Sequence, residues 1–275
     1  MKPILNPASE KIILATINDM PQSLLITGPK GVGLLTSAKY VAELLKVKPT
    51  IILPEKDEKI DLESGIITVD IMRKVADSVK TKSVNKNIII IDYAERMNAS
   101  AQNSFLKLLE EPNDNVYFIL VSNSASKLLP TTLSRVKKID IKPISSDQSV
   151  KLLDDLKVKD DTKRSQLLFM ANGLPAELTR LVNDDDYFKK SSDIMKDARE
   201  LLQGKLYQKL LIAQRYKDDR GMTLDLLTAV TKILKHSIDN KPQIDTIKRI
   251  DIVLKTYQRI EANGNIRLCL AYMVL

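Results

Sequence analysis

The sequence predicts an α/β fold with a parallel sheet of the phosphate-binding-loop type, followed by a purely helical region. Short apolar runs alternate with helical patterns up to about residue 142, and a glycine-rich loop joins the first run to a helix. Strand patterns fade beyond Pro143. With 275 residues, the chain exceeds the usual single-core size. We therefore predict an α/β domain over 1–142, a small helical domain over 143–184 and a larger helical domain over 185–275.

The predicted elements of the first domain follow from their hydrophobic patterns. Short runs rich in β-branched residues are typical of strands buried on both faces of a parallel sheet. The strands are expected at residues 24–27, 51–53, 88–91 and 116–121. Apolar residues at helical spacing predict helices over 9–19, 35–45, 68–79 and 94–111, with Ser9 as the cap of the first and Pro112 ending the last. Residues 57–61 are expected to form an exposed charged turn.

The rest of the chain shows helical patterns. Short helices are expected over 147–155, 163–171 and 176–182. Everything from 187 to 275 is helical in pattern, with breaks near Gly204, 218–221, 240–242 and 263–265. The only histidine, His236, lies in this region beside a lysine, and we interpret it as a surface residue rather than a catalytic one.

The most informative motif is a glycine loop that lacks two functional residues. Gly28, Gly31 and Gly33 follow the first strand and precede a helix. Functional loops of this type continue with a lysine that reaches the β- and γ-phosphates and a hydroxyl that holds Mg²⁺. Leu34 and Leu35 occupy those two positions here. Either the segment is no phosphate-binding loop, or it has lost hydrolysis.

Two further strands end in polar residues. Asp92 follows four consecutive isoleucines, as does the Mg²⁺-supporting acid of such enzymes, but Tyr93 stands where a water-polarising glutamate is usual. Ser122 and Asn123 end the strand over 116–121, where related enzymes place a γ-phosphate sensor. An isolated run of this kind is more often an ordinary core strand. Three such segments in this order favour a nucleotide-binding type of fold.

The composition limits the possible functions. The net charge of +8, from 43 basic and 35 acidic residues, permits a role near nucleic acid without establishing one, because acids are interleaved with the bases. Aromatic residues make up only 4% and tryptophan is absent, which argues against a base-stacking surface. A single cysteine, Cys269, rules out an internal disulfide and a cysteine-based zinc site. No metal site is expected.

The sequence predicts neither a membrane-spanning segment nor a secretion signal. No apolar run approaches the roughly 20 residues that span a bilayer. The first ten residues lack the basic-then-apolar pattern of a secretion signal. We therefore expect a cytoplasmic protein with no membrane partner.

Two segments carry a specific family resemblance. Residues 90–112 read IIDYAERMNASAQNSFLKLLEEP, and residues 128–135 read LLPTTLSR. Together with residues 117–123 and the tail over 263–275, they resemble the clamp-loader AAA+ subunits of bacterial DNA polymerase III. The resemblance covers most of the chain and is strongest across 85–142. It implies an AAA+ domain, a helical lid and a C-terminal collar that holds a hetero-oligomeric ring together.

The resemblance also implies roles for individual residues. In such rings ATP lies between neighbouring subunits, so Arg135, preceded by Ser134, would act in trans as an arginine finger on the adjacent subunit's ATP. Pro130 would begin the helix that presents it. Ala176 stands where the family's lid carries a sensor arginine. The resemblance implies that nucleotide contacts are lost at this position and also at Leu34, Leu35 and Tyr93. We therefore expect no hydrolysis by this chain, weak or no ATP binding, and no cofactor.

The implied function is that of a non-catalytic scaffold. Its partners would be the other clamp-loader subunits and, through the complex, the sliding clamp and primer–template DNA. Many relatives carry a four-cysteine zinc module, which this sequence lacks. Two alternatives remain open at this stage. The chain could be an ATPase with an unusual pocket that uses Lys30 and Thr36, or an inactive AAA+ adaptor outside replication.

Overall fold

The computed structural model describes residues 3–62, 64–80, 85–111, 113–240 and 243–274. Two compact units are present, Met1–Thr179 and Arg180–Leu275. The helix α8 (Pro175–Asn183) continues across this division. The domain boundaries predicted after residues 142 and 184 stay predictions. Each unit is described by itself.

The first unit is built on a five-stranded parallel sheet in the order β2-β5-β6-β1-β7. The strands are β1 (Ser23–Thr27), β2 (Thr50–Ile52), β5 (Asn87–Ile91), β6 (Val116–Ser122) and β7 (Lys137–Asp140). All five residues of β1 are buried, as expected for a strand with neighbours on both sides and helices on both faces. The predicted parallel sheet is confirmed. The edge strand β7 was not predicted, because Ile139 is its only buried residue.

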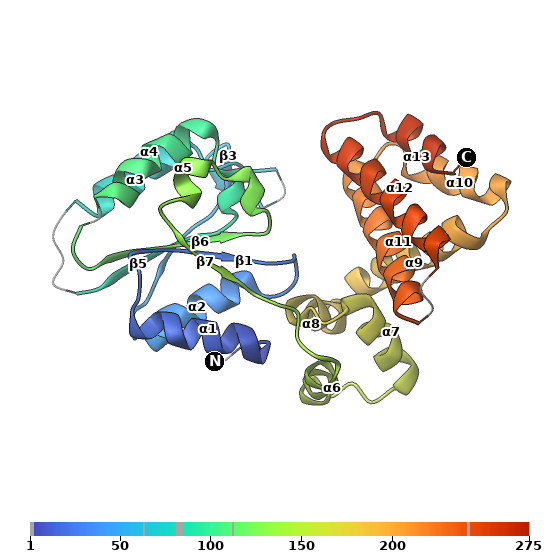
Figure 1. The fold of residues 1–275 in the computed structure, drawn as a ribbon, viewed down its shortest axis with the longest axis horizontal. Helices are drawn as coiled ribbons and strands as arrows, with labels where there is room; N and C mark the ends of the chain where they lie inside the picture. Colours follow the sequence, from blue (N-terminus) through green and yellow to red (C-terminus); the bar gives the residue numbers. More distant parts are fainter. Residues whose placement is uncertain (1–2, 63, 81–84, 112, 241–242, 275) are drawn as a thin grey trace. The chain divides into compact units, whose positions relative to one another are not determined.

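Helices cover both faces of the sheet (Figure 1). One face packs against α1 (Pro7–Asn18) and α2 (Leu34–Leu44), and the other against α3 (Val69–Ser78) and α4 (Ala99–Glu110). The hydrophobic core between the sheet and α3/α4 includes a T-shaped contact between Phe105 and Phe118, whose ring centroids lie 5.1 Å apart. The predicted strands and helices of this unit are therefore present, with shifted ends.

Three local predictions need correction. The first helix begins at Pro7, and Asn6 rather than Ser9 caps it, since the Asn6 side chain accepts from the Ala8 N–H at 3.0 Å. Ser9 is buried and its hydroxyl accepts from the Lys142 N–H at 2.9 Å. The charged turn is a β-hairpin of β3 (Glu55–Lys56) and β4 (Lys59–Ile60).

The helix predicted over 94–111 is divided. It consists of the 3₁₀ turn η1 (Ala94–Arg96) and α4, separated by the extended residue Met97. The Asn98 side chain accepts from the Ala101 N–H at 2.8 Å and so starts a new helix. Pro112, predicted to end the helix, lies outside the described residues.

The remainder of the first unit is helical. It contains η2 (Ala125–Lys127), α5 (Pro130–Leu133), α6 (Ser146–Asp155), α7 (Asp161–Ala171) and the start of α8. The three lid helices predicted from the sequence correspond to α6, α7 and α8. A capping box at Ser145 and Gln148 starts α6.

The second unit consists of helices in its described part. They are α9 (Asp185–Gln203), α10 (Leu206–Tyr216), α11 (Arg220–Asn240), α12 (Ile244–Glu261) and α13 (Ile266–Val274). The helix α11 packs against α9 and α12, while α13 packs against α10 and α12. In the described part of the chain, no helix is long and apolar enough to cross a membrane.

Candidate functional sites: the glycine loop and the Arg135 cluster

The carboxyl ends of three adjacent strands bring the glycine loop, Asp92 and Ser122 to one edge of the sheet. The loop connects β1 to α2, Asp92 follows β5, and Ser122 ends β6 opposite Thr27 of β1. In parallel α/β sheets this edge is where ligands bind. The three segments therefore lie together at one edge of the sheet.

The glycine loop keeps a backbone that only glycine adopts easily. Gly31 and Gly33 have φ angles of +90° and +89°, in the left-handed region. At Gly28 a Cβ atom would come within 2.6 Å of the Ile141 carbonyl oxygen. These conformations are those of a tight loop that approaches other backbone closely, so a side chain at Gly28 or Gly31 would not fit without displacement.

The side chains of the loop, in contrast, belong to the hydrophobic core. Val32 is 2% exposed and Leu34 is 6% exposed. Both lie in the apolar cluster between the sheet and α1/α2, against which Leu35 and Leu174 also pack. Leu34 is the first residue of α2, the position at which a functional loop presents its lysine. At this position the structure has a buried apolar side chain that packs in the core.

The N-terminus of α8 closes over this loop. The backbone N–H groups of Ala176 and Glu177 both donate to the Gly31 carbonyl oxygen, at 2.9 and 3.1 Å. A Cβ atom on Gly31 would lie only 2.9 Å from the Glu177 Cβ. The first N–H groups of a helix have no partner within the helix and are the ones that commonly bind anions. Here two of them bind the loop itself.

Asp92 is buried in a surrounding that disfavours its charge. It is 7% exposed, and its Oδ1 accepts from the Tyr93 N–H at 3.0 Å. Burial raises the pKa of Asp92, and the hydrogen bond from Tyr93 together with the charges of Lys39 and Arg96 only partly opposes this rise. Tyr93 itself has a φ of +53°, and its ring lies 4.9 Å from the Arg96 guanidinium carbon. The described residues contain no cluster of metal-ligating side chains.

The two sensor candidates differ in their surroundings. The Ser122 side chain is fully buried and its hydroxyl accepts from the Ser124 N–H at 3.1 Å. Asn123 is exposed. Lys30 and Thr36, the residues of the alternative pocket, are exposed as well.

Arg135 lies in a separate cluster just after α5. Its Nη1 donates to the Thr131 carbonyl oxygen at 2.9 Å and to the Ser134 hydroxyl at 3.1 Å. Its Nη2 lies 2.8 Å from Oε1 of Glu110, the last residue of α4. Pro130 is the first residue of α5, as predicted. The structure thus places Ser134 against Arg135, and the Arg135 side chain keeps 36% of its surface exposed.

Gln102 joins the segments beneath α5. The side chain is buried, and its Nε2 donates to the carbonyl oxygens of Met97 at 3.1 Å and Lys127 at 3.4 Å. Its Oε1 accepts from the Leu129 N–H at 2.7 Å. Sequence reasoning gave no role to Gln102 or Glu110, although both lie in the segment that carried the resemblance.

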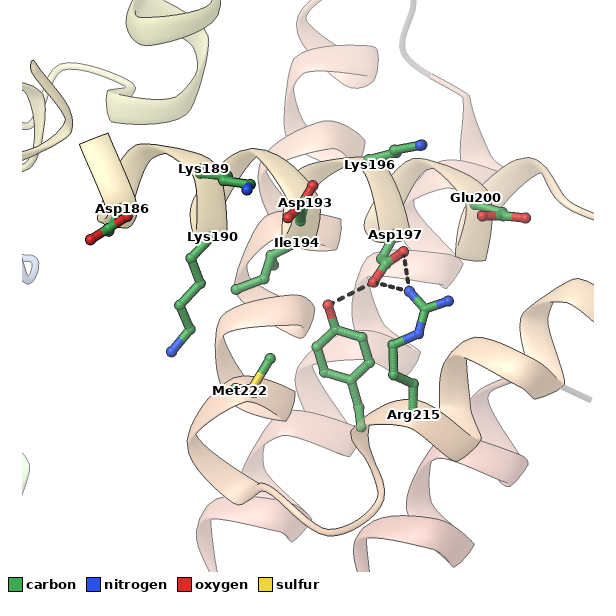
Figure 2. Close-up of a pocket in the computed structure, with 11 residues that line it drawn as sticks. Asp186, Lys189, Lys190, Asp193, Ile194, Lys196, Asp197, Glu200, Arg215 and Met222 are labelled. Carbon is green, nitrogen blue, oxygen red and sulfur yellow. Dashed lines mark hydrogen bonds and ion pairs between the residues drawn. The ribbon is translucent and has the colours of Figure 1, made fainter. Parts of the chain in front are cut away.

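A third cluster lies in the second unit, in a pocket of about 540 Å³ lined mainly by α9 and α10 (Figure 2). The Asp197 carboxylate accepts from Arg215 Nη1 at 2.8 Å and from the Tyr216 hydroxyl at 2.9 Å. Burial and the Asp197 carboxylate raise the pKa of Tyr216 well above its ordinary value. The three side chains connect α9 to α10, and the cluster was not predicted because its residues come from two helices.

Comparison with known proteins bears on these sites. The model of the family described as DNA polymerase III, delta subunit, matches residues 10–145. The chain is 24% identical over 220 residues to the DNA polymerase III delta' subunit of Bacillus subtilis, which covers 70% of this chain and 65% of the relative. It is 26% identical over 240 residues to the tau subunit of the same organism, covering 78% and 42%. The chain therefore spans less than two thirds of these relatives.

Solved structures show the same fold. A DNA polymerase III gamma subunit-related protein of Thermotoga maritima aligns with a TM-score of 0.50 and 18% identity, covering 97% of each chain. The chain thus has the predicted fold class, an AAA+ type of parallel sheet followed by a helical lid and an all-α C-terminal region. Residues 10–145 thus match the family of DNA polymerase III delta subunits, and the sequence similarity to the B. subtilis delta' subunit agrees with this match.

Proposed function

We propose that this chain is a non-catalytic subunit, of the delta' type, in a clamp-loader complex of DNA polymerase III. It braces a ring of AAA+ subunits that loads the sliding clamp onto primed DNA. It does not hydrolyse ATP, and it lends Arg135 to the ATP site of the neighbouring subunit. The match of residues 10–145 and the similarity to the B. subtilis delta' and tau subunits support a place in this assembly.

The observation that carries the non-catalytic role is the closed glycine loop. A triphosphate at this loop needs backbone N–H donors and a balancing positive charge, because a buried unpaired charge is costly. Leu34 supplies an apolar side chain where the lysine would stand, and this side chain is buried in the core. The first backbone N–H groups of α8 already donate to the Gly31 carbonyl oxygen. Nucleotide entry would break these two hydrogen bonds, at about 1 kcal/mol each, without gaining an ion pair from position 34.

The residue that follows Asp92 gives further support. Asp92 comes directly after β5, and burial raises the pKa of its carboxyl. Tyr93 adds no carboxylate for water activation. These residues keep the position of a catalytic pair without its chemistry.

The donated arginine is supported by the Arg135 cluster. A guanidinium directed at a γ-phosphate neutralises charge that spreads over the phosphate oxygens in the transition state, which increases the rate about 10³- to 10⁵-fold. Arg135 is exposed enough to reach another chain and is held in place by three contacts. Lysine would not replace it well, because it lacks the planar arrangement of donors.

Two measurements test the proposal. Affinity purification of the tagged full chain from its own cells is expected to recover the other clamp-loader subunits in stoichiometric amounts. Titration of Mg-ATP into the isolated chain is expected to give no binding at millimolar nucleotide. Recovery of an unrelated complex would favour an adaptor outside replication, and measurable Mg-ATP affinity would favour an ATPase that uses Lys30 and Thr36.

A further inference from the structure

The contacts of Arg135 use a defined part of its guanidinium. A guanidinium carries five N–H donors in one plane. Both N–H groups of Nη1 have acceptors, the Thr131 carbonyl oxygen and the Ser134 hydroxyl. One N–H of Nη2 faces Oε1 of Glu110. In the described part of the chain, this leaves Nε–H and the second N–H of Nη2 without acceptors. Two such donors suffice for a two-point contact with a phosphate group.

The acceptors fall into two groups with different effects. Thr131 and Ser134 lie within four residues of Arg135, so they hold the side chain against its own turn. Glu110 comes from another helix, and it is the only one of the three that carries a charge. Acceptors on two sides of a planar group fix its rotation, whereas acceptors on one side leave it free to swing.

The position of Glu110 is also unusual for a carboxylate. It is the last residue of α4, where the partial negative charge of the helix end disfavours another negative charge. The Arg135 guanidinium offsets this repulsion. The neighbouring Glu111, which caps the same helix end, is exposed and has no ion pair in the described part of the chain. The two adjacent glutamates thus provide a matched pair, of which only one contacts the arginine.

We infer that Glu110 is a positioning residue for Arg135. Its carboxylate holds the guanidinium plane and leaves the Nε–H and the second N–H of Nη2 available for the γ-phosphate in the neighbouring ATP site. A pre-oriented donor needs no ordering at the moment of reaction, and this lowers the barrier of the chemical step. Since Arg135 acts in this way only if it is donated to a neighbour, the inference rests on the proposed function.

The test uses the reconstituted complex and single-turnover ATP hydrolysis. The kinetic phase that is lost with Arg135→Ala identifies the ATP site that receives this arginine. Glu110→Ala is expected to slow that phase about fivefold, the order expected from an exposed ion pair. The ATP concentration that half-saturates the phase is expected to stay within about twofold, because nucleotide binding by the neighbour does not depend on the orientation of Arg135.

Three comparisons separate positioning from a structural effect. Glu110→Gln keeps an oxygen acceptor and is expected to retain more of the rate than Glu110→Ala. Glu111→Gln removes the same charge one residue further on and is expected to leave the phase unchanged. In the Arg135→Ala background, Glu110→Ala is expected to have no additional effect. Each variant is first checked for unchanged thermal unfolding and for stoichiometric assembly.

Two results would overturn the inference, and they differ in what they imply. If Arg135→Ala removes a phase but Glu110→Ala leaves its rate within twofold of the wild type, Glu110 does not position the arginine, while the donated arginine stands. If Arg135→Ala removes no phase, the proposed function fails, and the role of Glu110 fails with it. An equal loss for Glu111→Gln and Glu110→Gln would show a general charge effect and would also overturn the inference.

Discussion

Substitution of Gly31 by alanine tests whether α8 closes the glycine loop. Gly31 has a φ of +90°, so alanine there carries backbone strain of about 1 kcal/mol. Its Cβ atom would also lie 2.9 Å from the Glu177 Cβ, closer than two carbon atoms approach without displacement. Moving α8 away breaks the hydrogen bonds from Ala176 and Glu177 to Gly31, worth about 1 kcal/mol each. We expect a total loss of about 3 kcal/mol.

Gly33 supplies the matched control. It lies in the same loop with a φ of +89°, so Gly33→Ala introduces the same strain. The nearest atoms to its new Cβ would be 3.9 Å away, which is ordinary contact. The difference between the two variants therefore isolates the contact with α8. It should amount to about 2 kcal/mol, or about 4–8 °C in the melting temperature of a unit of this size.

The assay combines thermal unfolding with hydrogen exchange. In Gly31→Ala the amides of Ala176 and Glu177 are expected to lose protection, while in Gly33→Ala they keep it. Unfolding of the two units is followed separately, because a chain with two compact units need not unfold in one step. Equal stability of the two variants, with both amides still protected, would refute the closed loop.

The remaining predictions concern charge and hydrogen bonding. Arg135→Lys should fail to restore the hydrolysis lost with Arg135→Ala in the reconstituted complex, and full activity would contradict the need for a planar donor group. Asp92→Asn should stabilise the first unit at neutral pH, because burial raises the pKa of Asp92 and penalises the ionised form. Measured by denaturant titration, the gain in the free energy of unfolding should be complete above the raised pKa of Asp92 and should vanish below the ordinary pKa of an aspartate. A loss of stability at neutral pH would contradict this prediction. Tyr216→Phe should destabilise the second unit by about 1 kcal/mol, since Asp197 loses one donor but keeps Arg215. An unchanged melting temperature of the second unit in calorimetry would contradict this prediction.

Much of the fold follows from the sequence because it depends on local pattern. Three of the apolar runs before residue 142 became the central strands β1, β5 and β6, since strands buried on both faces consist almost entirely of apolar residues. The edge strand β7 was not predicted, because Ile139 is its only buried residue and a single apolar residue makes no strand pattern. The sequence predicts only a charged turn near Asp57 and Glu58, and the structure shows a tight hairpin in which both residues adopt positive φ angles.

Helix starts were harder to predict when two capping residues competed. Asn6 and Ser9 are both good caps, and the long-range hydrogen bond from Lys142 to Ser9 decides between them. The hydrogen bond between Lys142 and Ser9 joins residues far apart in the chain, so no local pattern predicts it. Asn98 is a different case, because its cap is local and divides a helix whose apolar pattern is continuous in the sequence.

In the candidate sites, too, some features could be predicted from the sequence and others could not. The missing lysine at Leu34 and the arginine at Arg135 were visible as residue types at fixed spacing. The closure of the loop by α8 joins Gly31 to residues far along the chain, so only the structure reveals it. The contact of Glu110 with Arg135 likewise joins two helix ends. The sequence thus predicts which residue types stand at these positions, and the structure shows which contacts they make.

The most direct test of the central claim is the single-turnover hydrolysis of ATP by the reconstituted complex with and without Arg135. We predict that Arg135→Ala leaves assembly intact and slows hydrolysis at one neighbouring site by about 10³-fold or more. Hydrolysis at an unchanged rate in a fully assembled complex would contradict the claim that this chain lends its arginine to another subunit.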